Sequence, residues 1–181
     1  MPRAAGGPQS AGRPRPIAGR AAPGQGIVGA RREVCPGATG LSDAFNLQRF
    51  VAAQAPVIEQ VLAELQAGRK RSHWMWFVFP QLRALGSSPT AVRYGISSLA
   101  EAQAYLEHPV LGPRIRECAR LVLGVRGATA GDIFGCPDDR KFHSSMTLFS
   151  RASADNQVFR DALTRYFGDV ADPATLERIK T

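Results

Sequence analysis

The stretch PVIEQVLAELQAG, residues 56–68, indicates the fold class of this chain. Its apolar residues recur with the 3.6-residue period of an α-helix and form one stripe, made of Val57, Ile58, Val61, Leu62 and Leu65. Proline suits the first turn of a helix and glycine the position just after its last turn, so Pro56 and Gly68 mark the two ends. The stretch therefore predicts an amphipathic helix that packs on a core.

Similar helical patterns follow one another along the rest of the chain. Ser98-Leu99-Ala100-Glu101 is predicted to form a capping box, in which the Ser98 hydroxyl accepts from the Glu101 amide and the Glu101 carboxylate reaches back to the Ser98 amide. The first helix is predicted to begin after Ser42 or Asp43. Further helices and turns are predicted over about residues 98–107, 112–125, 129–134, 138–149, 158–167 and 172–179. Alternation of period two is almost absent, so the sequence predicts an all-α fold, a compact single-domain bundle of several helices.

One segment does not follow this pattern. Trp74-Met75-Trp76-Phe77-Val78-Phe79 is a continuous apolar run. It is too short for periodicity to distinguish a helix from a buried strand, and Pro80 ends it in either case.

The N-terminal part of the chain has a different composition. Residues 1–40 contain nine glycines, six prolines and no aromatic residue. Such a segment buries too little apolar surface to offset the entropy lost on ordering it. We therefore predict a disordered basic tail over residues 1–42 and a folded domain over residues 43–181.

The tail also carries most of the net charge of +8. Six arginines against one glutamate give residues 1–40 a charge of +5, which leaves +3 for the rest of the chain. The domain is thus nearly neutral, and no specific nucleic-acid partner is expected. Nonspecific, salt-sensitive binding to polyanions would come from the tail.

Composition also argues against several other classes of protein. Cys35, Cys118 and Cys136 are odd in number and show no C-x-x-C spacing, which disfavours a disulfide framework and a zinc site and fits a reducing compartment. No apolar run approaches the roughly 20 residues that span a bilayer. We expect a cytoplasmic protein with no membrane partner, no metal and no cofactor.

The first candidate site is the segment of residues 69–81. Three cations, a histidine and two tryptophans fall within its first eight residues. Cations can bind a phosphate, an indole can stack on a ring, and His73 can give or take a proton. The predicted ligand-binding residues here are Lys70, Arg71, Trp74, Trp76 and Gln81. The alternative interpretation is a solvated basic helix end that leads into a core segment, with the tryptophans serving packing.

The second candidate site is the segment of residues 138–149. If it is helical, Lys141 lies one turn from Ser144 and Ser145, and Asp138 or Asp139 lies one turn before His143. A lysine beside hydroxyls can activate a nucleophile or hold a phosphate. The alternative interpretation is an acidic first turn, exposed ion pairs, and hydroxyls that bond back to helix carbonyls.

Three long motifs contain or adjoin these segments: GRKRSHWMWFVFPQL from residue 68, EAQAYLEHPVLGPRI from residue 101 and IFGCPDDRKFHSSMTLF from residue 133. In order and spacing, from about Phe45 to Ile179, the chain resembles the family known as domain of unknown function 1810. The resemblance implies a compact all-α single-domain fold, a bacterial-type cytoplasmic protein, and a helical or irregular Trp74 segment. Some members are labelled calpastatin-like, which describes a disordered inhibitor and does not suit a chain with a packed core.

The resemblance implies no activity, but it favours one pocket built from both segments. The matching positions are too polar for packing alone, and they are His73, Trp74, Trp76, Pro80, Gln81, Asp139, Lys141, Ser144 and Ser145. The one departure we note is Phe142, where an aliphatic residue is expected after Lys141.

The residues are compatible with three classes of function. In the first, an enzyme or binding domain uses its cations to neutralise a phosphorylated or nucleotide-like small molecule. The candidate catalytic residues are His73, Asp139, Lys141 and Ser144, and Ser145 is a further candidate for ligand binding. In the second, a non-enzymatic interaction module presents the Trp74 segment to an unknown protein partner, which predicts exposed indoles. The third and weaker class is nonspecific nucleic-acid binding through the tail.

Overall fold

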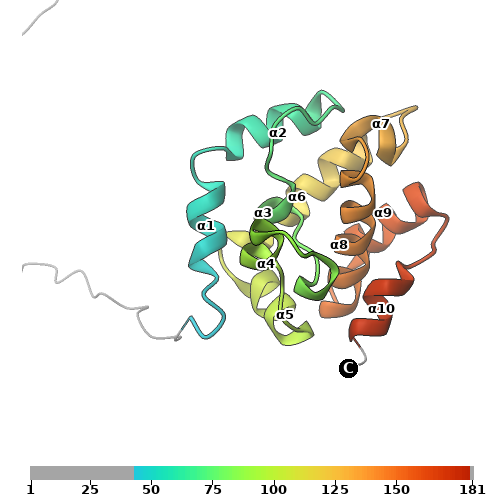
Figure 1. The fold of residues 1–181 in the computed structure, drawn as a ribbon. Helices are drawn as coiled ribbons and strands as arrows, with labels where there is room; N and C mark the ends of the chain where they lie inside the picture. Colours follow the sequence, from blue (N-terminus) through green and yellow to red (C-terminus); the bar gives the residue numbers. More distant parts are fainter. Residues whose placement is uncertain (1–42, 180–181) are drawn as a thin grey trace, which may run out of the picture. The chain divides into compact units, whose positions relative to one another are not determined.

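The computed structural model of the chain describes residues 43–179 (Figure 1). Within these residues the chain forms ten α-helices and one 3-10 helix, and no β-strand. The elements in order are α1 (Gln48–Gln54), α2 (Ile58–Gln66), α3 (Met75–Val78), η1 (Arg83–Leu85), α4 (Pro89–Tyr94), α5 (Leu99–Glu107), α6 (Leu111–Gly124), α7 (Ala130–Phe134), α8 (Asp138–Ala152), α9 (Gln157–Phe167) and α10 (Pro173–Ile179). The predicted all-α fold is confirmed. The predicted tail, residues 1–42, lies outside the described residues.

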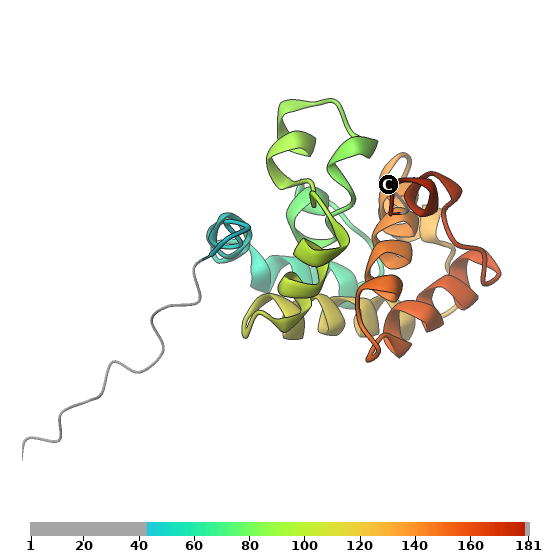
Figure 2. The same ribbon diagram turned by 90° about the horizontal axis from the view of Figure 1, so that it is seen from below.

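Helix α8 is the central element of the domain. It packs against α3, α5, α7, α9 and α10. Figure 1 and Figure 2 show α5 on one side of it and α9 on the other. Every side chain from Ser144 to Ser150 is buried, which follows from the number of elements that surround the helix. The acidic first turn, Asp138 and Asp139, complements the positive end of the helix dipole as predicted.

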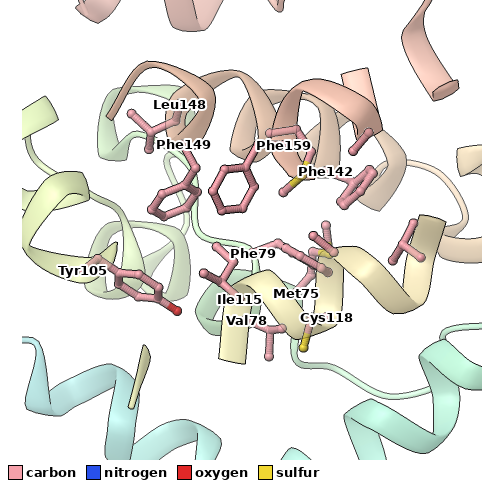
Figure 3. Close-up of a cluster of buried hydrophobic side chains, with 14 of the residues drawn as sticks. Met75, Val78, Phe79, Tyr105, Ile115, Cys118, Phe142, Leu148, Phe149 and Phe159 are labelled. Atoms are coloured by element: carbon pink, nitrogen blue, oxygen red, sulfur yellow. The ribbon is translucent and has the colours of Figure 1, made fainter. Parts of the chain in front are cut away.

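The core around α8 is rich in aromatic rings. The ring centroid of Phe142 lies 4.6 Å from that of Phe134 and 5.1 Å from that of Phe79. Two helical turns further along, the ring centroid of Phe149 lies 5.3 Å from that of Tyr105. Figure 3 shows how α8 directs Phe142 and Phe149 toward the rings that other elements supply. Such pairs contribute about 0.5–1.5 kcal/mol each beyond the burial of their area.

Helix α2 follows the predicted pattern, with one small difference at its start. It begins at Ile58, two residues after Pro56, which precedes the first turn and does not lie in it. Val61 and Leu65 are buried against the core. Gly68 has a φ of +66°, the left-handed conformation that ends many helices, and a Cβ there would lie 2.9 Å from Cγ1 of Val125. This close contact holds the end of α2 against α6.

The predicted capping box at the start of α5 is only half right. The Ser98 hydroxyl accepts from the Glu101 amide at 3.2 Å. The Glu101 carboxylate does not reach back to Ser98; it accepts from the amide of Ser97 at 2.7 Å and forms an ion pair with Arg49 at 2.5 Å. A nearby cation attracts the buried carboxylate more strongly than the helix end does. A complete capping box occurs at α7, where Thr129 and Asp132 exchange both hydrogen bonds.

The Trp74 segment is helical, as the family resemblance implies. Helix α3 is a single turn, and the backbone leaves helical geometry at Phe79, just before Pro80. The amide nitrogen of the buried Gln54 side chain donates to the carbonyl oxygen of Phe77 at 2.7 Å. This contact satisfies a carbonyl that so short a helix leaves without an intrahelical partner.

The segment after Pro80 contains two elements that the sequence patterns did not predict, η1 and α4. The amide of Arg83 donates to the carbonyl of Ile96 at 2.8 Å, and the amide of Ile96 donates to the carbonyl of Gln81 at 2.9 Å. Residues 81–83 thus pair with Ile96, and the residues between them form a closed loop. Ser88 caps α4 through the amide of Ala91. Elements this short have too few residues for periodicity to reveal them.

Candidate functional site

The buried carboxylate of Glu64 holds the first candidate segment in place. One oxygen accepts from the amides of Arg71 and Ser72 at 2.8 and 3.1 Å and from the indole nitrogen of Trp74 at 2.8 Å. The other accepts from the Ser72 hydroxyl at 2.7 Å and from the Gln60 side chain at 3.1 Å. The loop between α2 and α3 is therefore organised around a residue of α2.

Glu64 is not among the predicted site residues, although the sequence contains a signal for it. Glu64 follows Val61 by three residues and precedes Leu65, so it lies on the apolar face of α2. A carboxylate on the buried face of a helix needs donors, and the next loop supplies them.

We expect a pH effect from this carboxylate. Burial raises the pKa of Glu64, but the hydrogen bonds from Arg71, Ser72 and Trp74 outweigh this effect. The net result is a pKa of about 2, below the ordinary value of 4.5. Because the pKa is lower in the folded state, Glu64 stabilises the fold fully above pH 4.5, and this contribution is lost as the pH falls toward 2. The difference in unfolding free energy between wild type and Glu64→Ala, measured by urea denaturation, should therefore shrink across this window. For the exposed Glu59→Ala the difference should stay small throughout, and a constant Glu64→Ala difference would contradict the expectation.

Asp138 joins the two candidate segments. Its carboxylate oxygens lie 2.7 Å from Nζ of Lys70, at the start of the first segment, and 2.7 Å from Nζ of Lys141, one turn further along α8. The three side chains are largely shielded, with 8% of Lys70, 14% of Asp138 and 19% of Lys141 exposed. Burial raises the pKa of Asp138, but the hydrogen bonds and charges of the two lysines lower it by more. Two ammonium groups share one carboxylate, so the cluster has an excess of one positive charge.

The two tryptophans near this cluster have different environments. Nζ of Lys141 lies 4.1 Å from the centre of the Trp76 ring, within the range of a cation–π contact, and Trp76 is half-buried. Trp74 is 1% exposed and donates its indole N–H to Glu64. Nζ of Lys70 also lies 5.4 Å from the centre of the Trp74 ring. Each tryptophan therefore has a lysine beside it, but only Trp76 is partly exposed, whereas Trp74 belongs to the core.

The remaining predicted residues of α8 are Ser144, Ser145 and Asp139, and only some of their polar atoms have a hydrogen-bond partner. The Ser144 hydroxyl donates to Asp172 at 3.1 Å, which ties α8 to the start of α10. The hydroxyl of Ser145, four residues after Lys141, is buried without a hydrogen-bond partner, and so is one carboxylate oxygen of Asp139. Most buried polar atoms in proteins are satisfied, so Ser145 and Asp139 are exceptions within α8.

The predicted residues of the first segment lie closer to solvent. Arg71 and His73 are exposed, and Gln81 is half-buried. Within residues 43–179, no hydrogen bond or ion pair joins His73 to Asp139. The structure thus brings Lys70, Lys141 and Trp76 together around Asp138, and it does not show His73 in contact with the other candidate catalytic residues.

A family model described as "Protein of unknown function (DUF1810)" matches residues 44–179. The chain belongs to this family. The DUF1810 chain is also similar to a solved structure, that of the conserved hypothetical protein Rv1873 from Mycobacterium tuberculosis. The two share 60% sequence identity with a TM-score of 0.76, over 77% of this chain and 99% of that chain. No curated protein matches the chain.

Two further observations on the DUF1810 domain bear on its function. In the part of the chain that the structure describes, no helix is both long and apolar enough to cross a membrane. Over the same residues, no group of three or more histidine, cysteine, aspartate or glutamate side chains is arranged to hold a metal ion. Cys118 is buried and Cys136 exposed, and both are free thiols, while Cys35 lies outside the described residues.

The burial of Trp74 bears on the hypothesis of an interaction module. That hypothesis predicts exposed indoles, but the Trp74 ring is enclosed by the core and lies 6.3 Å from the Phe79 ring and 6.5 Å from the Phe134 ring. Trp74 therefore cannot form a partner surface in this conformation, whereas Trp76 is half-buried, and the interaction module stays a prediction.

Proposed function

We propose that this DUF1810 domain binds a small anionic molecule with an aromatic ring, a phosphorylated or nucleotide-like compound, beside Lys70, Lys141 and Trp76. The observation that carries the proposal is the cluster in which two lysines share the single carboxylate of Asp138 while one of them lies over the Trp76 ring. An anionic group would neutralise the excess positive charge, and the indole would stack on the ring of the ligand.

The surroundings of the cluster support an anionic ligand. The exposed Arg71 and His73 belong to the same loop as Lys70 and add cationic and hydrogen-bonding groups. The backbone of that loop is held at both ends, because the Lys70 amide donates to the carbonyl of Ile133 at 2.7 Å and Glu64 holds the residues that follow. A loop held in this way loses little entropy when it binds a ligand.

Binding is better supported than catalysis. In this structure Lys141 is paired with Asp138, and Ser144 donates to Asp172, the carboxylate that also caps α10, so both groups have structural partners. The catalytic roles of His73, Asp139, Lys141 and Ser144 stay predictions, as do ligand contacts by Gln81 and Ser145. A cytoplasmic location also stays a prediction.

Replacing Lys141 with methionine should weaken ligand binding at least about tenfold, because it removes the cation next to Trp76 and leaves Lys70 fully neutralised by Asp138. Isothermal titration with AMP and with NAD measures the effect. The matched control is Arg140→Met, which removes the same charge from the neighbouring exposed position and should bind as wild type does. If neither compound binds to wild type, or if both variants lose binding equally, the proposed site is wrong.

A further inference from the structure

A second possible binding site lies away from the lysine cluster, where the C-terminal ends of α2 and α6 meet. The two helix ends enclose an open hollow of about 480 Å³, formed by residues 66–68 on one side and by residues 120–121 and 124–126 on the other. The volume falls within the range of about 300–1,000 Å³ that is usual for small-molecule sites. None of Lys70, Lys141 and Trp76 lines it.

The charged groups around the hollow are unbalanced. Arg120 and Arg126 line it and are exposed, and no acidic residue lines it. Within the described residues, neither guanidinium group has an ion pair or a hydrogen bond. The neighbouring Arg165, in contrast, donates to the carbonyl oxygen of Val125. Two arginines thus flank the hollow with their donors directed to no protein group.

The negative ends of the helix dipoles offset part of this positive charge. The C-terminus of a helix carries roughly half a negative charge, so the ends of α2 and α6 together offset about one of the two guanidinium groups. The hollow keeps about one positive charge. Several carbonyls at these helix ends already accept from protein donors, those of Ala63, Glu64 and Leu65 from backbone amides and that of Val122 from Val125 and Tyr166. Only the remaining carbonyls of the last turns can serve as hydrogen-bond acceptors next to the arginines.

These features match a particular class of ligand. The arginines require an anionic group, and guanidinium groups bind phosphate with two parallel hydrogen bonds. Hydroxyl groups of a ligand can donate to the helix-end carbonyls that have no donor within the protein. The residues that line the hollow include no aromatic side chain, so a stacked base has no partner here. We propose that the hollow binds the phosphate ester of a small polyhydroxylated compound, with the phosphate between Arg120 and Arg126.

The test uses the full chain and ribose 5-phosphate as the probe in isothermal titration. The double variant Arg120→Gln/Arg126→Gln should weaken binding at least about tenfold, because both phosphate contacts are lost. The control Arg151→Gln/Arg160→Gln removes the same charge from two exposed positions on α8 and α9 and should bind as wild type does. Ribose without the phosphate should not bind detectably.

Other outcomes would overturn the proposal and separate it from the site at Lys141. If ribose 5-phosphate does not bind to wild type, or if the control loses as much affinity as the double variant, the hollow is not a specific site. If Lys141→Met abolishes binding while Arg120→Gln/Arg126→Gln retains it, the sugar phosphate occupies the lysine cluster instead. Retention by Lys141→Met together with loss in the arginine variant supports the hollow, whatever the outcome of the AMP and NAD titrations.

Discussion

Replacing Glu64 with alanine should lower the free energy of unfolding by about 4 kcal/mol. The change removes a buried carboxylate that accepts from two backbone amides, a hydroxyl and an indole N–H of the loop between α2 and α3. Hydrogen bonds to a charged group contribute about 1.5–3 kcal/mol each, and buried donors left without a partner add a penalty. The sum is reduced because water can enter the space that the side chain leaves.

Chemical denaturation followed by circular dichroism measures this loss. Glu59→Ala is the matched control, since Glu59 lies on the same helix, carries the same charge and is exposed. It should change the unfolding free energy by no more than about 0.5 kcal/mol. A loss below about 1 kcal/mol for Glu64→Ala would show that the loop of residues 69–74 is stabilised mainly by other contacts.

Replacing Phe142 with alanine should have an effect of similar size, about 4 kcal/mol, because it leaves a large cavity at the centre of the core. Phe142 is fully buried, and its ring lies within 6.2 Å of the rings of Phe79, Phe134, Tyr166 and Phe167. Phe142→Leu should cost less, since leucine retains much of the apolar volume. Leucine also represents the aliphatic residue that the family pattern leads us to expect at this position.

The same denaturation experiment compares these variants with Val170→Ala. Val170 is 58% exposed, so its truncation should cost no more than about 0.5 kcal/mol. If Phe142→Leu were as stable as wild type, the phenylalanine would not be needed for the packing of this core. Equal losses for Phe142→Leu and Phe142→Ala would mean that the aromatic contacts, and not the filled volume, stabilise the site.

Local signals account for what the sequence predicted correctly. The last predicted element begins at Asp172, whose carboxylate caps α10 by accepting from the Thr175 amide at 2.9 Å. The predicted element of residues 129–134 likewise begins at the N-cap Thr129, and Gly68 follows the end of α2 as expected. Capping and apolar periodicity involve residues within a few positions of one another, so they can be read from the chain directly. The elements that were missed, η1 and α4, are too short to show a period.

The contacts within the candidate site, in contrast, could not be predicted from local signals. The sequence indicated that residues 69–81 and 138–149 belong together, but it did not identify Asp138 as the residue that joins them or Glu64 as the residue that holds the first segment. It also did not distinguish the core residue Trp74 from Trp76, which lies beside Lys141. These roles depend on contacts between residues far apart in the chain.

The sequence by itself thus determined the helical class, most helix ends and the two segments of interest, because each depends on hydrogen bonds and periodicities within a single element. The tertiary structure decided which polar side chains meet. A buried charge pairs with whichever donor or counter-ion the packing of the helices brings within reach. In this way Glu101 pairs with Arg49 as well as with Ser97 at the start of its own helix, and Lys70 and Lys141 meet on the same carboxylate.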